Sequence, residues 1–135
     1  MSTKRKTSKK KPMPSGIVWF EIPADDPGRA RKFYSGLFGW KITRFPAAVE
    51  EYWHIDTGGP DASPDGGMLK KKGAEHTITN YVSVASVDRA AAKVEKLGGR
   101  ICMTKTAVPL MGYFVICLDT EGNMFALWEK DDKAK

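Results

Sequence analysis

The sequence is poor in side chains that bind divalent metal ions or act as covalent nucleophiles. Its 135 residues include only two histidines and two cysteines, and Cys102 and Cys117 do not form a C-x-x-C motif. No glycine-rich loop joins a predicted strand to a helix, so a phosphate-binding motif of that kind is absent. No serine or cysteine stands in a recognisable nucleophile motif, and covalent hydrolysis therefore has no support. We expect both cysteines to be reduced and buried.

Long apolar runs are also missing. No stretch approaches the ~18 residues that a membrane-spanning helix needs, and no apolar segment of a secretory signal follows the lysines near the N-terminus. The sequence therefore predicts a cytoplasmic protein with no membrane contact. Its hydrophobic content of 41% and charged content of 28% are ordinary for a globular protein, and the chain is long enough for one domain with a real core.

The net charge of +6 is confined to the N-terminus. Residues 1–16 hold six of the 22 basic residues and no acidic one, which leaves 16 basic against 16 acidic residues in the remainder. We expect this tail to be disordered, because it has no large apolar side chain other than Met. We interpret it as a solubilising extension. Weak, non-specific binding of nucleic acid through residues 4–11 is the alternative.

The first half of the remainder, at about 17–72, reads as a β-α-β-β-β module. Strands are predicted at 17–22, where Pro23 follows, and at 41–45, 52–56 and 67–71. A helix is predicted at 26–40, because Asp26 and Pro27 suit its start and Gly39 suits its end. Its apolar stripe consists of Ala30, Phe33, Tyr34, Leu37 and Phe38.

The second half, at about 78–129, repeats this order of elements. Strands are predicted at 79–84, 100–105, 112–118 and 123–129, and residues 130–135 form a polar tail. Between the first two strands a helix follows Ser86, with a stripe of Val87, Ala90, Ala91, Val94 and Leu97. One helix covers only one face of a four-stranded sheet. We therefore expect a single α+β domain at 17–129, in which two βαβββ modules form one curled mixed sheet, with the helices outside and a cavity at the junction.

Two motifs add to this repeat. The segment FYSGLFGW lies at 33–40, and the turn DTEGN lies at 119–123, before the last strand. With these motifs the chain resembles the vicinal oxygen chelate superfamily, which includes glyoxalase I, bleomycin-resistance proteins and extradiol dioxygenases. The resemblance extends from Gly16 to Glu129. It implies the glyoxalase/bleomycin-resistance fold and a homodimer, but it specifies no reaction.

In metal enzymes of this superfamily, one residue on the first strand and one on the last strand of each module bind a divalent ion, and these residues are usually His or Glu. The resemblance carries the four positions onto Trp19, Met68, Thr79 and Ala126. Divalent ions need carboxylate, imidazole or thiolate donors, which these side chains lack. We therefore expect no metal site and no cofactor, and we predict a protein that binds a small molecule without a metal. A glyoxalase- or dioxygenase-type enzyme with a relocated metal is the alternative.

Alternation along the strands separates the residues that face the helices from those that face the cavity. On the first strand, Val18, Phe20 and Ile22 suit the helix side. The predicted ligand-binding residues are Trp19, Glu21, Met68, Thr79, Tyr81, Ala126 and Trp128. This lining suits a flat aromatic or apolar organic ligand. For the two tryptophans, a place in the core or in a dimer interface is the alternative.

Two side chains are candidate catalytic bases. Glu21 would point into an apolar cup, although a position on the rim or a pairing with Lys70 also explains it. His54 shares a strand face with Tyr52 and Asp56, and it could act as a general base near neutral pH or be structural. Whether any reaction is catalysed stays open at this point.

Overall fold

The repeated module predicted from the sequence is present. The computed structural model describes residues 15–46, 50–60 and 63–135. Its elements are β1 (Ile17–Ala24), α1 (Pro27–Phe38), β2 (Lys41–Arg44), β3 (Tyr52–Asp56), β4 (Asp65–Lys70), β5 (Thr79–Ser83), α2 (Val87–Lys96), β6 (Arg100–Val108), β7 (Gly112–Leu118) and β8 (Met124–Lys130). The basic segment at 4–11 lies outside the described residues. Among the helices of the described ranges, none has the length and apolar character needed to span a membrane.

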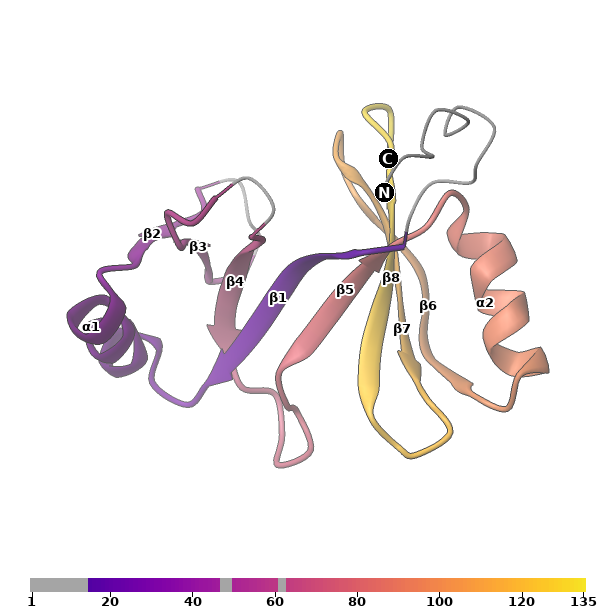
Figure 1. Cartoon of the computed structure of the whole chain (residues 1–135), viewed down its shortest axis with the longest axis horizontal. Helices are drawn as coiled ribbons and strands as arrows, with labels where there is room; N and C mark the ends of the chain where they lie inside the picture. The colour runs from indigo at the N-terminus through magenta and orange to yellow at the C-terminus, as the bar shows by residue number, and fades with distance from the viewer. Residues whose placement is uncertain (1–14, 47–49, 61–62) are drawn as a thin grey trace, which may run out of the picture.

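All eight strands belong to one mixed sheet, in the order β2-β3-β4-β1-β5-β8-β7-β6. In each module the first strand pairs in parallel with the last, β1 with β4 and β5 with β8. The modules meet where β1 and β5 pair antiparallel, so that Trp19 stands opposite Tyr81 and Glu21 opposite Thr79. Figure 1 shows the open, curled sheet, with α1 at one end and α2 at the other. The predicted α+β architecture of paired βαβββ modules is thereby confirmed.

Both helices pack on the same face of the sheet, and we call the opposite face the inner face. The core under α1 consists of Ile22, Ala24, Ile42, Ile55 and Met68, against which Ala30 and Tyr34 of the helix pack. The core between α2 and the sheet consists of Val87 of the helix and of Val115, Cys117 and Leu127 on β7 and β8. Burial of these apolar side chains holds each helix on its half of the sheet. Among the described residues, neither helix covers the inner face.

The apolar stripe predicted for α1 is only partly buried. Ala30 and Tyr34 reach the core, whereas Phe33, Leu37 and Phe38 are 60%, 59% and 57% exposed. The helix rests on the sheet along a narrow line, so the outer side of a wide apolar stripe has no sheet beneath it. The Phe38 ring instead lies beside those of Tyr34 and Trp40. Only two of the five residues in the predicted stripe therefore pack on the core beneath α1.

Three smaller predictions are corrected by the structure. Pro23 does not end β1: β5 pairs with β1 only as far as Glu21, so the missing amide of Pro23 falls where β1 has β4 alone as a described neighbour. Leu97 is 69% exposed, because α2 ends at Lys96. Both cysteines are free, and Cys117 is buried as predicted, whereas Cys102 is exposed on β6, at the edge of the sheet.

Candidate functional site

Glu21 is the centre of a polar cluster on the inner face. Its Oε2 accepts a hydrogen bond from the Tyr52 hydroxyl at 2.6 Å, and its Oε1 accepts one from the Tyr81 hydroxyl at 3.1 Å. The indole Nε1 of Trp19 donates to the Tyr52 hydroxyl oxygen at 3.0 Å. Three strands from both modules therefore contribute to one network. Glu21 is held by two tyrosines and not by Lys70, which is exposed at the end of β4.

A glycine on β4 makes room for this cluster. Gly67 stands opposite Glu21 in the β1–β4 ladder and opposite His54 in the β3–β4 ladder. A Cβ atom added at Gly67 would collide with the hydroxyl and the ring of Tyr52. Glycine in a strand often marks such a close approach of a neighbouring group. Tyr52 can therefore lie across β4 toward Glu21 only because position 67 has no side chain.

The cluster changes the acidity of its two phenols. Burial raises the pKa of Tyr52 and Tyr81 above the ordinary tyrosine value. The negative charge of Glu21 raises both pKa values further, and so do the hydrogen bonds that the two hydroxyls donate to it. Both phenols thus stay protonated in the folded protein at a pH where exposed tyrosines ionise.

The raised pKa values of Tyr52 and Tyr81 predict a loss of stability at alkaline pH. Because the folded state holds the phenolic protons more tightly than the unfolded state, the stabilisation is complete below a pH of about 10 and is lost as the pH rises above it. Urea unfolding between about pH 8 and 11 should show a smaller loss of unfolding free energy for Tyr81→Phe than for the wild type. Equal losses in the two proteins would contradict the raised pKa of the Tyr81 phenol in the folded state.

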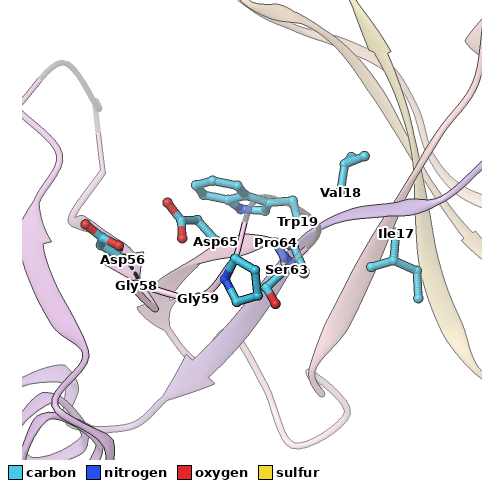
Figure 2. A pocket seen from close by; sticks show the side chains of 10 residues that line it. Ile17, Val18, Trp19, Asp56, Gly58, Gly59, Ser63, Pro64 and Asp65 are labelled. Carbon is cyan, nitrogen blue, oxygen red and sulfur yellow. Dashed lines mark hydrogen bonds between the residues drawn. The ribbon is translucent and has the colours of Figure 1, made fainter.

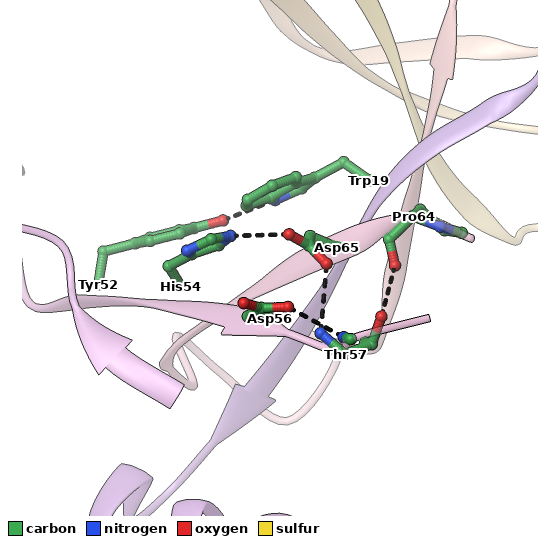
Figure 3. A network of polar contacts seen from close by, with 8 residues as sticks. Trp19, Tyr52, His54, Asp56, Thr57, Pro64 and Asp65 are labelled. Carbon is green, nitrogen blue, oxygen red and sulfur yellow. Dashed lines mark hydrogen bonds and ion pairs between the residues drawn. The ribbon is translucent and has the colours of Figure 1, made fainter. Parts of the chain in front are cut away.

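His54 and Asp65 form a second polar pair beside the Glu21 cluster. The Nε2 atom of His54 lies 3.2 Å from Oδ2 of Asp65, and Oδ1 of Asp65 accepts a hydrogen bond from the Thr57 amide at 3.2 Å. The imidazole lies parallel to the indole of Trp19, with the ring planes 5° apart and the centroids 5.7 Å apart. Figure 3 shows this pair with Trp19 and Tyr52 above it. Trp19 is therefore the residue that joins the two polar groups.

Trp19 also lines a pocket of about 470 Å³ that is open to solvent, which we call the Trp19 pocket. The other walls are residues 17–18 of β1, Asp56 at the end of β3, and the segments 58–60 and 63–65 (Figure 2). The Asp56 carboxylate accepts a hydrogen bond from the Gly58 amide at 2.9 Å, which fixes the turn after β3. The volume of the pocket is in the range that suits a small organic molecule.

The predicted ligand-binding residues are not equally accessible. Trp19, Glu21 and Tyr81 come together on the inner face, as the hydrogen bonds show. Thr79 and Ala126 are only 2% and 0% exposed, so neighbouring side chains cover them. Trp128 is half-buried and lies over Gly112, where a Cβ atom would meet its indole ring.

Met68 lies on the wrong side of the sheet for the predicted site. It has no exposed surface and packs in the core under α1, while its neighbour Gly67 stands opposite Glu21. A shift of one residue along a strand moves a side chain to the opposite face. The position that the resemblance carries to Met68 therefore belongs to Gly67, one residue earlier on β4. The prediction that Val18 faces the helix is also wrong. Val18 is 42% exposed and lines the Trp19 pocket instead of the core under α1.

Sequence reasoning missed two residues of the site. Tyr52 was grouped with His54 on one strand face, but its contact with Glu21 was not foreseen. The signal that could have found it is the pair Gly66-Gly67 on the neighbouring strand, since two glycines in a strand leave space above them. Asp65 lies just before the strand predicted at 67–71, and no pattern in the sequence marks it as the partner of His54.

The residues at the predicted metal positions do not fit a divalent ion. On β4 the position belongs to Gly67 and not to Met68. The four positions then carry the indole of Trp19, no side chain at Gly67, the hydroxyl of Thr79 and the methyl group of Ala126. Zinc and similar ions need nitrogen, sulfur or carboxylate ligands. Within residues 15–46, 50–60 and 63–135, no three side chains of His, Cys, Asp or Glu lie close enough together to hold a metal ion.

Known proteins similar to this chain share its fold. A family model described as the Glyoxalase/Bleomycin resistance protein/Dioxygenase superfamily matches residues 16–127. An anthracycline biosynthesis protein, DnrV of Streptomyces peucetius, is 29% identical over 134 residues, covering 87% of this chain and 48% of the relative. A glyoxylase-like domain-containing protein of Didymella fabae is 32% identical over 129 residues, covering 87% of this chain and 95% of the relative.

Solved structures agree with these sequence matches. A glyoxalase/bleomycin resistance protein/dioxygenase superfamily member from Vibrio splendidus superposes with a TM-score of 0.64 at 12% identity, over 87% of this chain and 99% of that chain. At this identity the likeness concerns the fold alone. The chain spans about half the length of the first curated relatives it matches.

Proposed function

Since this chain belongs to the Glyoxalase/Bleomycin resistance protein/Dioxygenase superfamily, we propose that it binds a small organic molecule with a flat aromatic or apolar part, and does so without a metal ion. The ligand lies in the Trp19 pocket and against the adjoining inner face. Trp19 supplies the aromatic wall, and the Glu21 cluster holds that wall in place. Homodimerisation stays a prediction, which a measurement of mass in solution would test.

The observation that carries this proposal is the hydrogen bonding of Glu21. Both of its oxygens accept hydrogen bonds from tyrosine hydroxyls, and Tyr52 in turn accepts one from Trp19. An array of this kind, with its donors paired, fixes the orientation of the rings around it. A rigid aromatic wall loses little conformational entropy when a flat ligand stacks on it, which favours binding.

The relatives suggest which ligands to test first. The Streptomyces peucetius relative is named for anthracycline biosynthesis, and anthracyclines contain flat, fused aromatic rings. A thermal-shift screen would therefore compare anthracyclines, catechols and thiol-conjugated aldehydes, each with and without a chelator. At a ligand concentration about 100 times Kd, we expect an aromatic ligand to raise the Tm by roughly 5–10 °C with the chelator present.

The competing proposal is an enzyme of the glyoxalase or dioxygenase type with a relocated metal. His54 and Asp65 are the residues that favour it, because an oriented imidazole can act as a base. Elemental analysis of tag-free protein separates the two proposals. One bound divalent ion per chain would overturn metal-independent binding, whereas a thermal shift that persists in chelator with no such ion supports it.

A further inference from the structure

The Trp19 pocket combines an aromatic wall with acidic side chains. Asp56 and Asp65 both contribute to its lining, and no residue lining it is a lysine, an arginine or a histidine. In Figure 2 the Asp65 carboxyl group lies close to the Trp19 ring, and the Asp56 carboxyl group lies farther from it, beside Gly58. The pocket is therefore an open site of ligand size whose charged lining residues are all acidic.

The nearby charges do not balance these carboxylates. Glu21 lies two residues beyond Trp19 on the same face of β1, and its partners are the neutral hydroxyls of Tyr52 and Tyr81. Among the described residues Glu21 has no ion-pair partner, and neither has Asp56. Two neighbouring side chains can carry positive charge. His54 already contacts Asp65, and Lys41 stands opposite Asp56 in the β2–β3 ladder but belongs to none of the ion pairs among the described residues. The two carboxylates of the lining itself would repel an anionic ligand.

A cation would gain two interactions in the same place. It would reduce the mutual repulsion of the carboxylates, and it could approach the electron-rich face of the Trp19 indole, which attracts positive charge. We infer that the ligand of the Trp19 pocket is a cationic organic molecule, an aromatic amine salt or a quaternary ammonium compound, whose charged group faces Asp56 and Asp65. This inference rests on the proposed function and assigns the charge class of its ligand.

Three probes with the same ring system test the charge requirement. They are the naphthylmethyl trimethylammonium cation, neutral naphthylmethanol and naphthoate, each titrated calorimetrically into the full chain. We expect the cation to bind on the order of tenfold more tightly than the neutral probe, and the anion to bind most weakly. The preference for the cation should shrink as salt is added, since screening weakens the carboxylate contribution.

A charge-removing variant locates the effect. Asp56→Asn keeps the shape and the acceptor that holds the turn. It should weaken binding of the cation by roughly two- to fivefold and change the affinity for the neutral probe by less. Asp88→Asn, at a 69% exposed carboxylate of α2 that pairs with Lys105 of β6, is the matched control and should alter neither affinity.

The outcomes separate this inference from the proposed function. If the neutral probe binds as tightly as the cation, or if Asp88→Asn weakens the cation as much as Asp56→Asn does, the inference is overturned and an aromatic ligand site remains. If none of the three probes binds, and the wider screen with aromatic compounds is also silent, the proposed function is overturned together with it.

Discussion

Gly67→Ala is expected to lower the free energy of unfolding by about 1–3 kcal/mol, the usual cost of forcing an extra group into a packed site. The new methyl group would meet the hydroxyl and ring of Tyr52. Tyr52 must then swing away from β4, which breaks its hydrogen bond to Glu21 and leaves a carboxylate oxygen without that partner. Urea unfolding followed by tryptophan fluorescence measures the loss.

Gly36→Ala is the matched control for this substitution. Gly36 lies within α1, and a Cβ atom added there meets nothing within 4 Å. Alanine is a better helix former than glycine, so this variant should be more stable than the wild type by about 0.5–1 kcal/mol. The same glycine-to-alanine change should thus lower the free energy of unfolding at position 67 and raise it at position 36. A Gly67→Ala protein as stable as the wild type would show that Tyr52 does not depend on the space above Gly67.

Trp19→Ala is expected to have the largest effect on ligand binding. The substitution removes the aromatic wall of the pocket, the ring on which His54 stacks and the donor to Tyr52. Aromatic contacts of this kind contribute enough for a loss of affinity on the order of tenfold or more. The affinity for any hit of the ligand screen, measured by calorimetry, gives the answer directly.

Two further variants distinguish loss of the wall from general damage. Trp19→Phe keeps an aromatic face but removes the indole N–H, so we expect it to retain most of the affinity while it weakens the tyrosine network. Trp53→Phe changes a tryptophan that packs against the core under α1, and ligand affinity should not change. Unaltered affinity in Trp19→Ala would show that the ligand binds elsewhere.

The fold was predictable because its signals are local. Asp26 accepts a hydrogen bond from the amide of Arg29 at the start of α1, and Gly39 adopts a left-handed conformation at its end, with φ of 74°. Ser86 caps α2 in the same way. Such caps and the helical spacing of apolar residues can be read within a few positions of one another. The order of the elements, repeated twice, then limits the architecture.

The site was harder to predict because its contacts join distant parts of the chain. Glu21 meets Tyr52 across 31 positions and Tyr81 across 60. Which face a residue occupies depends on the register of its strand, and an error of one position placed Met68 on the inner face. The position of Trp19 can be counted back from the sequence motif at 33–40. No comparable motif lies close to β4.

The central claim is that an aromatic ligand binds at Trp19 without a divalent ion. Calorimetric titration of one ligand into chelator-treated wild-type protein, and then into the same protein after addition of Zn²⁺, Mn²⁺ or Fe²⁺, tests it most directly. The account predicts the same affinity in all of these titrations, with Trp19→Ala weaker in each. Binding that disappears in chelator and returns with one of the metal ions would contradict it.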